Sequence, residues 1–439
     1  MSSVEHLPSK LFDLKSLTPI DPDQAKIHIP WSYRAYKPES TKQLQDLYPQ
    51  IRLQESAFPN GMWLLLAGEA PNVVMPWLMN GDNLADALLD IYNAHALTQN
   101  REGIGPNVDK LSVLSVFGDW RQDLPSKKNL PPKDPDSQLK NKDQEVEEMA
   151  MVIAQSSWSQ AVASLMKHVA NVDNLITIDG HSFIAKQHFE AEGINVVNIT
   201  TAKLIIEAIR NKGLLKNNLS TMIAGVDFGN LALAHKLSQE ENFELGILRK
   251  HRIPTGNGST SITKHELIYG DVQNKRVILM DDLIGSGGTI LNTVELLLKH
   301  GVKEIIVCAS HAVFAGREYY EQLQKVLKYD QVKLVMVSDT LPLERLTRGS
   351  DKDLPYIQVP RNDAKPERKQ VAMLNVDDFI AYTVGVMLSS QNNEEIITKM
   401  KEHVLPQPDP YELYHQITGK KILKPVITAT YREGNFQSI

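Results

Sequence analysis

Short apolar runs alternate with helix-like segments over most of the chain beyond residue 110. The apolar runs have the length and the Val, Ile and Leu content of buried strands, and they occupy residues 111–117, 175–178, 194–199, 222–226, 245–248, 276–280, 304–309 and 333–337. Apolar positions at helical spacing lie between several of them, for example Ile290, Leu291, Val294, Leu297 and Leu298. Repeated strand–helix units predict mainly parallel sheets covered by helices, so the expected fold class is α/β.

The first part of the chain has a weaker pattern. An apolar run at 62–67 predicts a strand, and helical spacing predicts helices at 84–97 and 147–168. Residues 124–145 are rich in Lys, Pro and Asp, which is typical of a solvated loop or insertion. The strands outnumber those of one compact sheet. We therefore expect two similar domains at 46–190 and 191–390, between an N-terminal extension at 1–45 and a polar tail at 391–439.

Composition narrows the classes of protein that the chain can represent. Its 439 residues leave room for two or three domains, and 42% hydrophobic with 23% charged residues is ordinary for a globular protein. The net charge of −6 argues against nucleic acid as a partner. The lone Cys308 excludes an internal disulfide and, within an apolar run, is expected in the core. No signal-peptide pattern and no long apolar run are evident, so we expect a cytoplasmic protein without membrane contact.

The stretch from Arg276 to His300 carries the most informative pattern. A strand is followed by the carboxylates Asp281 and Asp282, then by a loop and an amphipathic helix, and the loop consists of Gly285, Ser286, Gly287, Gly288 and Thr289. Glycines and a helix N-terminus favour an anion such as a phosphate, to which the hydroxyls add donors. A carboxylate pair suits two vicinal hydroxyls, so the combination indicates a ribose 5-phosphate. The alternative is a buried strand with an ordinary glycine turn.

Polar residues follow four other predicted strands, where a core strand would simply turn. They are Arg121 and Gln122, Asp179 with His181, Asp227, and Lys250 with Arg252. Because ligands of parallel sheets lie at the carboxyl ends of strands, these positions together predict a site for Mg²⁺ and a polyphosphate.

Each of these residues also has a purely structural interpretation. Arg121 would then be a surface ion-pair partner, His181 a hydrogen-bonded core histidine and Asp227 a helix cap. Lys250 and Arg252 would be solvated charges of an edge strand. A Gly/Ser/Thr-rich loop is expected after them, at about 253–263, and its mobility favours a functional role.

The segment DDLIGSGGT resembles the phosphoribosyl-diphosphate loop of type I phosphoribosyltransferases and of ribose-phosphate diphosphokinase (PRPP synthetase). Similarity to the second family extends over about 55–385, through the segments NGDNLADALL, VFGDWRQD, ITIDGHSFIAKQHF, GVDFGNLALAHK, LRKHR and SHAVFAG. A phosphoribosyltransferase would explain the first loop and not the N-terminal half, so the diphosphokinase family is favoured.

This resemblance implies two phosphoribosyltransferase-like domains and the transfer of diphosphate from Mg-ATP to the anomeric hydroxyl of ribose 5-phosphate, giving PRPP and AMP. It places ATP near Arg121 and Gln122, with Phe58 and Asn60 in the matching adenine-side turn. By the same resemblance, His181 and Asp227 serve Mg²⁺, Lys250 and Arg252 act on the transferred group, and 281–289 binds the ribose phosphate. The family also implies a homo-oligomer with a nucleotide site shared between subunits.

Two departures from the family keep other functions open. Met62 and Gly285 stand where the family has carboxylates. One alternative is a non-catalytic regulatory subunit that keeps the fold. Another is a phosphoribosyltransferase or diphosphokinase with a changed substrate.

Overall fold

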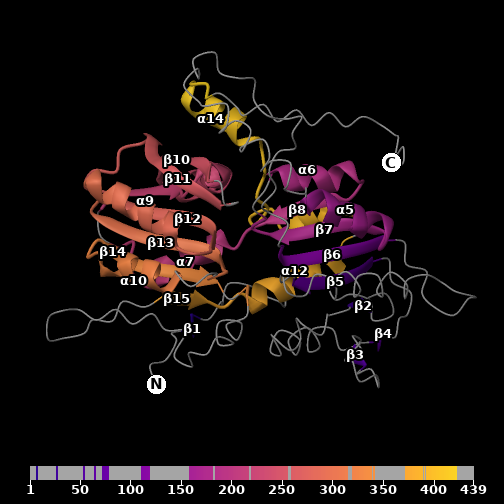
Figure 1. Ribbon diagram of the computed structural model, residues 1–439. Helices are drawn as coiled ribbons and strands as arrows, with labels where there is room; N and C mark the ends of the chain where they lie inside the picture. Colours follow the sequence, from indigo (N-terminus) through magenta and orange to yellow (C-terminus); the bar gives the residue numbers. More distant parts are fainter. Residues whose placement is uncertain are drawn as a thin grey trace, which may run out of the picture.

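The computed structural model describes residues 6–7, 26–27, 53–54, 64–65, 72–78, 110–118, 158–180, 183–216, 219–255, 259–314, 319–338, 340–341, 371–388, 390 and 392–422. Within these ranges the chain forms a five-stranded sheet and an eight-stranded sheet that lie side by side (Figure 1), and a separate two-stranded pair, β3 (Leu53–Gln54) with β4 (Leu64–Leu65). No described helix is long and apolar enough to cross a membrane.

The five-stranded sheet is parallel throughout. Its order is β2 (Lys26–Ile27), β5 (Asn72–Leu78), β6 (Lys110–Phe117), β7 (Val172–Ile178) and β8 (Asn195–Ile199). The helices α5 (Trp158–His168) and α6 (Phe183–Ala191) pack against each other beside β7 and β8. Two later helices return to this sheet, α12 (Asp377–Leu388) on β5 and β6 and α13 (Asn393–Lys399) on β8. The chain therefore leaves the smaller sheet and comes back to it.

The eight-stranded sheet is parallel except at one edge. Its order is β1 (His6–Leu7), β15 (Val371–Leu374), β14 (Val332–Ser338), β13 (Glu304–Ala312), β12 (Arg276–Ile284), β9 (Thr221–Gly225), β10 (Glu244–Thr255) and β11 (Ser259–Tyr269). The antiparallel pair is β10 with β11, a long hairpin. Its helices are α7 (Ala202–Asn211), α8 (Leu231–Glu241), α9 (Gly288–Lys299), α10 (Tyr319–Lys328) and α14 (Pro410–Thr418).

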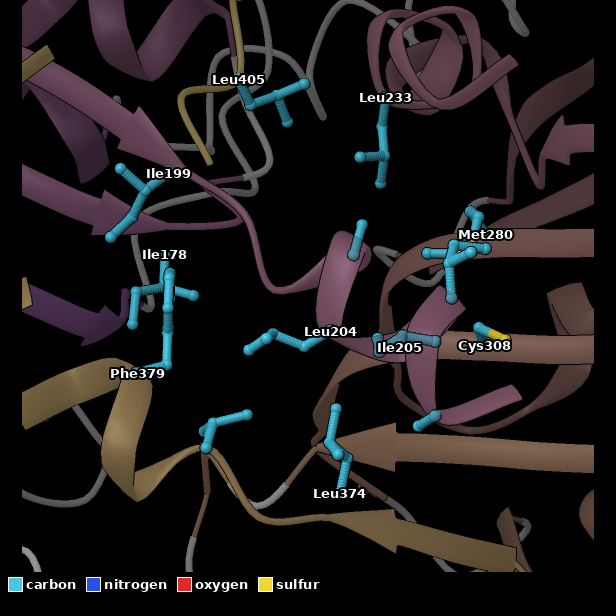
Figure 2. Close-up of a cluster of buried hydrophobic side chains, with 14 of the residues drawn as sticks. Ile178, Ile199, Leu204, Ile205, Leu233, Met280, Cys308, Leu374, Phe379 and Leu405 are labelled. Atoms are coloured by element: carbon cyan, nitrogen blue, oxygen red, sulfur yellow. The ribbon is translucent and has the colours of Figure 1, made fainter. Parts of the chain in front are cut away.

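One hydrophobic core joins the two sheets. Leu204 and Ile205 of α7 point into a cluster that contains Ile178 of the smaller sheet and Met280 of the larger one (Figure 2). Apolar burial is the main stabilising force in folding, so this shared cluster holds the sheets together as one body. Cys308 belongs to it, is fully buried as expected, and burial raises the pKa of its thiol well above the ordinary range.

The sequence correctly predicted the α/β class and the mainly parallel sheets. Of the strand expected at 62–67, the described residues Leu64 and Leu65 form β4, which pairs antiparallel with β3. Other local expectations were wrong. β5 was not anticipated, because Pro76 interrupts its apolar run. The loop expected at 253–263 is largely the hairpin of β10 and β11. The strand expected at 276–280 continues to Ile284 and includes both aspartates.

The domain boundaries stay a prediction, and the packing crosses them. Beyond residue 190, β8 still pairs with β7 of the smaller sheet. Beyond residue 390, Leu405 donates its backbone N–H to the carbonyl of Asn198. The helix expected at 84–97, the first part of the one expected at 147–168, and the insertion at 124–145 lie outside the described residues.

Candidate functional site

Three carboxylates from two neighbouring strands converge on the side-chain amide of Asn230. β9 pairs with β12, so Asp227, just beyond β9, lies close to Asp281 and Asp282. Asn230 Nδ2 donates to Asp281 Oδ1 at 2.8 Å, to Asp227 Oδ1 at 3.3 Å and to Asp282 Oδ1 at 3.5 Å. All four residues are buried. The amide therefore fixes the relative positions of the acidic groups at this edge of the sheet.

Asp227 also caps the short 3₁₀ turn η3 (Phe228–Asn230), because its Oδ1 accepts from the backbone N–H of Gly229 at 2.9 Å. The structural interpretation of this aspartate is thus realised. Capping the turn does not prevent Asp227 from binding a ligand as well, since a carboxylate oxygen can accept at more than one lone pair. Close packing supports the turn: a Cβ on Gly225 would lie only 2.8 Å from the carbonyl oxygen of Asn230.

The glycine loop leads from β12 directly into α9. Gly287 has φ = +79°, a left-handed conformation that suits glycine, and α9 begins at Gly288. No side chain caps this helix and no acidic residue occupies its first turn. The first N–H groups of the helix therefore suit an anion, with Ser286 exposed and Thr289 half-buried beside them.

The hairpin of β10 and β11 is fastened to this site by His265. In the ladder, Lys250 stands opposite His265 and Arg252 opposite Ile262. The Nε2 atom of His265 lies 3.1 Å from the carbonyl oxygen of Val226, and its Nδ1 lies 3.2 Å from Thr293 Oγ1, which donates to the carbonyl of Thr289. The strand that faces Lys250 is therefore tied both to the end of β9 and to the first turns of α9.

A second group of hydrogen bonds joins the two sheets at the ends of β7 and β13. Ser310 Oγ donates to Asp179 Oδ2 at 2.6 Å, and His311 Nε2 lies 3.0 Å from the carbonyl oxygen of Ile178. Asp179 Oδ2 also accepts from the backbone N–H and the hydroxyl of Thr201, each at 3.0 Å. We call Ile178, Asp179, Ser310 and His311 the inter-sheet clamp; all four are buried, and Asp179 has φ = +46°.

The structure brings Asp227 close to Asp281 and Asp282, and the loop at 285–289 follows those two aspartates in the chain. That these residues form a binding site stays a prediction. The backbones of Lys250 and Arg252 lie in β10. Phe58, Asn60, Arg121, Gln122 and His181 lie outside the described residues.

Sequence reasoning missed Asn230, His265 and the roles of Ser310 and His311. Asn230, Ser310 and His311 lie within segments that resemble the diphosphokinase family. Their positions in those segments could therefore have marked them as candidate site residues. His265 carried no such signal, because it lies in an unremarkable polar strand.

The donor set at the strand ends suits a magnesium ion. Buried carboxylate oxygens are the protein ligands that Mg²⁺ prefers, and it commonly takes one or two of them, with waters and substrate phosphates completing the shell. Within the described ranges no group of three or more His, Cys, Asp or Glu side chains is arranged to hold a metal ion. Asp227 fits the role of a single carboxylate ligand, with waters and a phosphate as the other ligands of the ion.

Comparison with known proteins gives a consistent picture. Residues 196–338 match the family described as the phosphoribosyl transferase domain. The ribose-phosphate pyrophosphokinase of Campylobacter jejuni is 31% identical over 201 residues, which are 46% of this chain and 57% of that protein. The same enzyme of Haemophilus influenzae is 30% identical over 195 residues, 44% of this chain and 56% of that protein. The chain thus spans about half the length of the curated relatives it matches.

Among solved structures, the phosphoribosylpyrophosphate synthetase of Mycobacterium smegmatis is similar over 84% of this chain and 99% of its own, with a TM-score of 0.53 and 18% identity. At this identity the likeness concerns the fold.

Proposed function

We propose that the chain transfers diphosphate from Mg-ATP to ribose 5-phosphate. Its phosphoribosyl transferase domain match and its similarity to ribose-phosphate pyrophosphokinases support this proposal. The products are PRPP and AMP. Homo-oligomerisation and a cytoplasmic location remain predictions of the sequence.

One observation carries the proposal. Buried Asp281 and Asp282 lie near the carboxyl end of the central strand β12, and an uncapped helix N-terminus follows within a few residues. Asp227, just beyond the neighbouring strand β9, shares the same amide donor. In the proposed site, the two adjacent carboxylates bind a diol, the N–H groups of the helix bind a phosphate and Asp227 binds a cation. A sugar phosphate that reacts with a metal-bound polyphosphate uses all three.

In this proposal the protein's residues position the substrates and stabilise the charge of the transferred group, and none of them forms a covalent bond with a substrate. Asp281 and Asp282 accept from the ribose 2- and 3-hydroxyls, while 285–289 holds the 5-phosphate. The oxygen of the 1-hydroxyl attacks the β-phosphorus of ATP and its proton passes to water, the bond from that phosphorus to the α,β-bridging oxygen breaks, and AMP departs. Lys250 and Arg252 stabilise the charge of the moving diphosphate. Mg²⁺, when bound by Asp227 and His181, would neutralise part of the triphosphate charge.

The test incubates the full chain with Mg²⁺, ATP and ribose 5-phosphate and follows AMP and PRPP. We expect both products in equal amounts. Asp282→Asn should lower the rate by about 10²-fold, the usual cost of a lost charge-assisted contact in a reacting complex. Gln239→Ala, an exposed change on α8, is the control that should leave the rate unchanged. Absence of AMP, together with intact binding of ribose 5-phosphate, would contradict the proposal.

A non-catalytic relative is the second candidate, and Gly285 favours it. A Cβ at this position would meet only Leu283 Cδ1, at 3.6 Å, so the backbone accepts the first carbon of a side chain where the family carries a carboxylate. If the wild-type chain forms no AMP and Gly285→Asp restores product formation, the loss of that carboxylate explains the inactivity. If neither chain is active, a regulatory subunit is the better description.

A further inference from the structure

The helix α14, near the end of the described residues, packs on the larger sheet beside β10 (Figure 1). Its ends are well defined in the sequence. Asp409 accepts from the backbone N–H of Tyr411 at 2.9 Å and caps the helix, Pro410 occupies its first turn, and Gly419 ends it with φ = +70°. These signals favour a helix locally, within a tail that was expected to be polar. α14 is therefore a regular element that gives its side chains a fixed orientation.

One face of α14 is buried against the larger sheet. Leu413 and Tyr414 form one hydrophobic cluster with Leu231, the first residue of α8, and with Ile247 of β10. Burial removes the apolar surface of these side chains from water, which holds the helix on the sheet. α14 is thus fixed at the point where α8 begins, directly after the turn η3.

Phe228, the first residue of η3, contacts two rings of α14. Its ring centroid lies 5.1 Å from that of Tyr411 and 5.6 Å from that of Tyr414, and the ring planes are tilted by 51° and 49°. These distances are favourable for aromatic pairs. Gly229 is exposed, whereas Phe228 is half-buried. The two tyrosine rings therefore cover a turn that would otherwise present an aromatic side chain to water.

The same turn is packed against β9 and carries the amide of Asn230. A Cβ on Gly225 of β9 would lie 2.8 Å from the Cβ of Asn230, so strand and turn are in close contact. The backbone N–H of Asn230 donates to the carbonyl of Asp227 at 3.2 Å. The backbone N–H of Leu231 donates to the carbonyl of Phe228. Because Phe228 and Asn230 belong to one short hydrogen-bonded turn, a shift of the ring displaces the amide as well.

We infer that Tyr411 and Tyr414 are positioning residues for the carboxylate pair of β12, and that they act through the turn η3. This inference rests on the proposed function, in which that pair accepts from the sugar hydroxyls. Asn230 donates to Asp281 at 2.8 Å, so a displaced turn moves the amide away from the carboxylate that it orients. Adjacent carboxylates repel each other at short range, and the amide offsets part of that repulsion. α14 thereby serves recognition of the hydroxyls, whereas the loop at 285–289 serves the phosphate.

The experiment measures binding to the full chain by calorimetry, with ribose 5-phosphate, 2-deoxyribose 5-phosphate and inorganic phosphate as probes. The wild type should bind ribose 5-phosphate about 10–100-fold more tightly than the deoxy sugar, which lacks one hydroxyl for a charge-assisted hydrogen bond. Tyr411→Ala should lower this ratio by about 3–10-fold, because displaced carboxylates hold that hydroxyl less well. Phe228→Leu, a milder change on the other side of the contact, should lower it too. Affinity for inorganic phosphate should change by less than about twofold, since the loop at 285–289 holds that anion.

Three controls separate positioning from a general loss of stability. Tyr411→Phe keeps the ring and should give the wild-type ratio, as should Gln416→Ala, an exposed change on α14. Met166→Ala removes a fully buried side chain from α5 in the smaller sheet, so it should lower stability and leave the ratio unchanged.

An unchanged ratio in Tyr411→Ala and Phe228→Leu would overturn the inference, and so would an equal loss in Met166→Ala or a parallel loss of phosphate affinity. A wild type that binds the two sugar phosphates equally, or binds neither, would overturn it as well. If the wild type discriminates between the sugars but forms no AMP, the proposed function fails, and the ratios still decide the role of α14.

Discussion

At the scale of single residues, Asn230 and Gly287 set the geometry of the candidate site. Asn230 supplies one amide to three carboxylates that would otherwise repel one another at short range. Gly287 takes a left-handed conformation that lets α9 start directly after the strand. Neither residue has to contact a ligand in order to affect binding. Asn230 positions the carboxylates, and Gly287 positions the first N–H groups of α9.

The two adjacent glycines at the start of α9 should respond differently to alanine. Gly287→Ala forces a side chain into φ = +79°, with its Cβ 3.2 Å from Gln322 Cβ, and should lower the free energy of unfolding by about 1–2 kcal/mol. Gly288→Ala is the control for stability, since its Cβ would meet only Ser286 Oγ at 3.8 Å. Urea unfolding measures both. An equal loss of stability in the two variants would refute this explanation.

At the scale of elements, the hairpin of β10 and β11 is the clearest difference between expectation and structure. A mobile loop was expected after Lys250 and Arg252, whereas β10 continues to Thr255 and turns back as β11. His265 then fastens the hairpin to the carbonyl of Val226 and to Thr293 of α9. A catalytic cation on this element would be presented by a ladder of backbone bonds, and its position relative to the phosphate loop would depend on His265.

Replacing His265 should therefore impair turnover more than binding. His265→Ala removes the link between the hairpin and the end of β9, and a misplacement of a catalytic group by about 1 Å can cost about 10²-fold in rate. We expect kcat in the AMP assay to fall by about 10–100-fold while the KM for ribose 5-phosphate changes little. Tyr269→Ser, an exposed change on the same strand, should leave kcat unchanged. A rise in KM alone would show that His265 acts on binding.

His403, whose carbonyl accepts from the backbone N–H of Thr200 just beyond β8, gives the smaller sheet a pH-dependent contact. Burial lowers the pKa of His403, although a hydrogen bond to the carbonyl of Thr200 and the charge of Glu402 act in the opposite direction. The unfolded chain takes up a proton near the ordinary pKa of 6.5, whereas the folded chain resists it to lower pH. The contribution to stability is present above that pH and is lost as the pH falls towards the folded pKa.

Unfolding free energies at several pH values test this contribution. Between about pH 7 and pH 5, His403→Gln should lose less stability than the wild type, because it removes the proton uptake of the unfolded chain. Lys203 and Lys236, which oppose a charge on His403, remain in both chains. His300→Gln, at an exposed position, is the control and should keep the wild-type slope. An unchanged slope in His403→Gln would exclude this histidine as the source.

At the scale of the whole molecule, two different kinds of interaction, hydrophobic burial and hydrogen bonding, hold the two sheets together as one unit. The shared hydrophobic cluster around α7 supplies non-directional burial, which holds the sheets together (Figure 2). The inter-sheet clamp supplies directional hydrogen bonds, which decide how they are aligned. Residues 403–414 add a third link, because Gln407 bonds to the carbonyl of Gly180 and Tyr411 packs on Phe228.

The clamp should show energetic coupling across the sheets. In a double-mutant cycle with Asp179→Asn and Ser310→Ala, we expect an interaction energy of about 0.5–3 kcal/mol in urea unfolding, as for buried hydrogen-bonded neighbours. Asparagine is suitable at position 179 because it tolerates a left-handed conformation. Ser238→Ala, which removes a buried hydroxyl bonded within α8, should combine additively with Ser310→Ala. Additivity in the first cycle would mean that the clamp does not align the sheets.

The features that could be predicted from the sequence involve residues close together in the chain. The contacts that could not be predicted join residues that are far apart in the chain. The β12–loop–α9 unit and its two aspartates were recognisable because a strand period, a glycine run and a helix period follow one another directly between 276 and 300. Asp179 and Ser310 meet across 131 positions, and Gln407 and Gly180 across 227, so no periodicity could indicate either contact. The sequence thus determined which chemical groups are present, and the packing of the two sheets decided which of them meet.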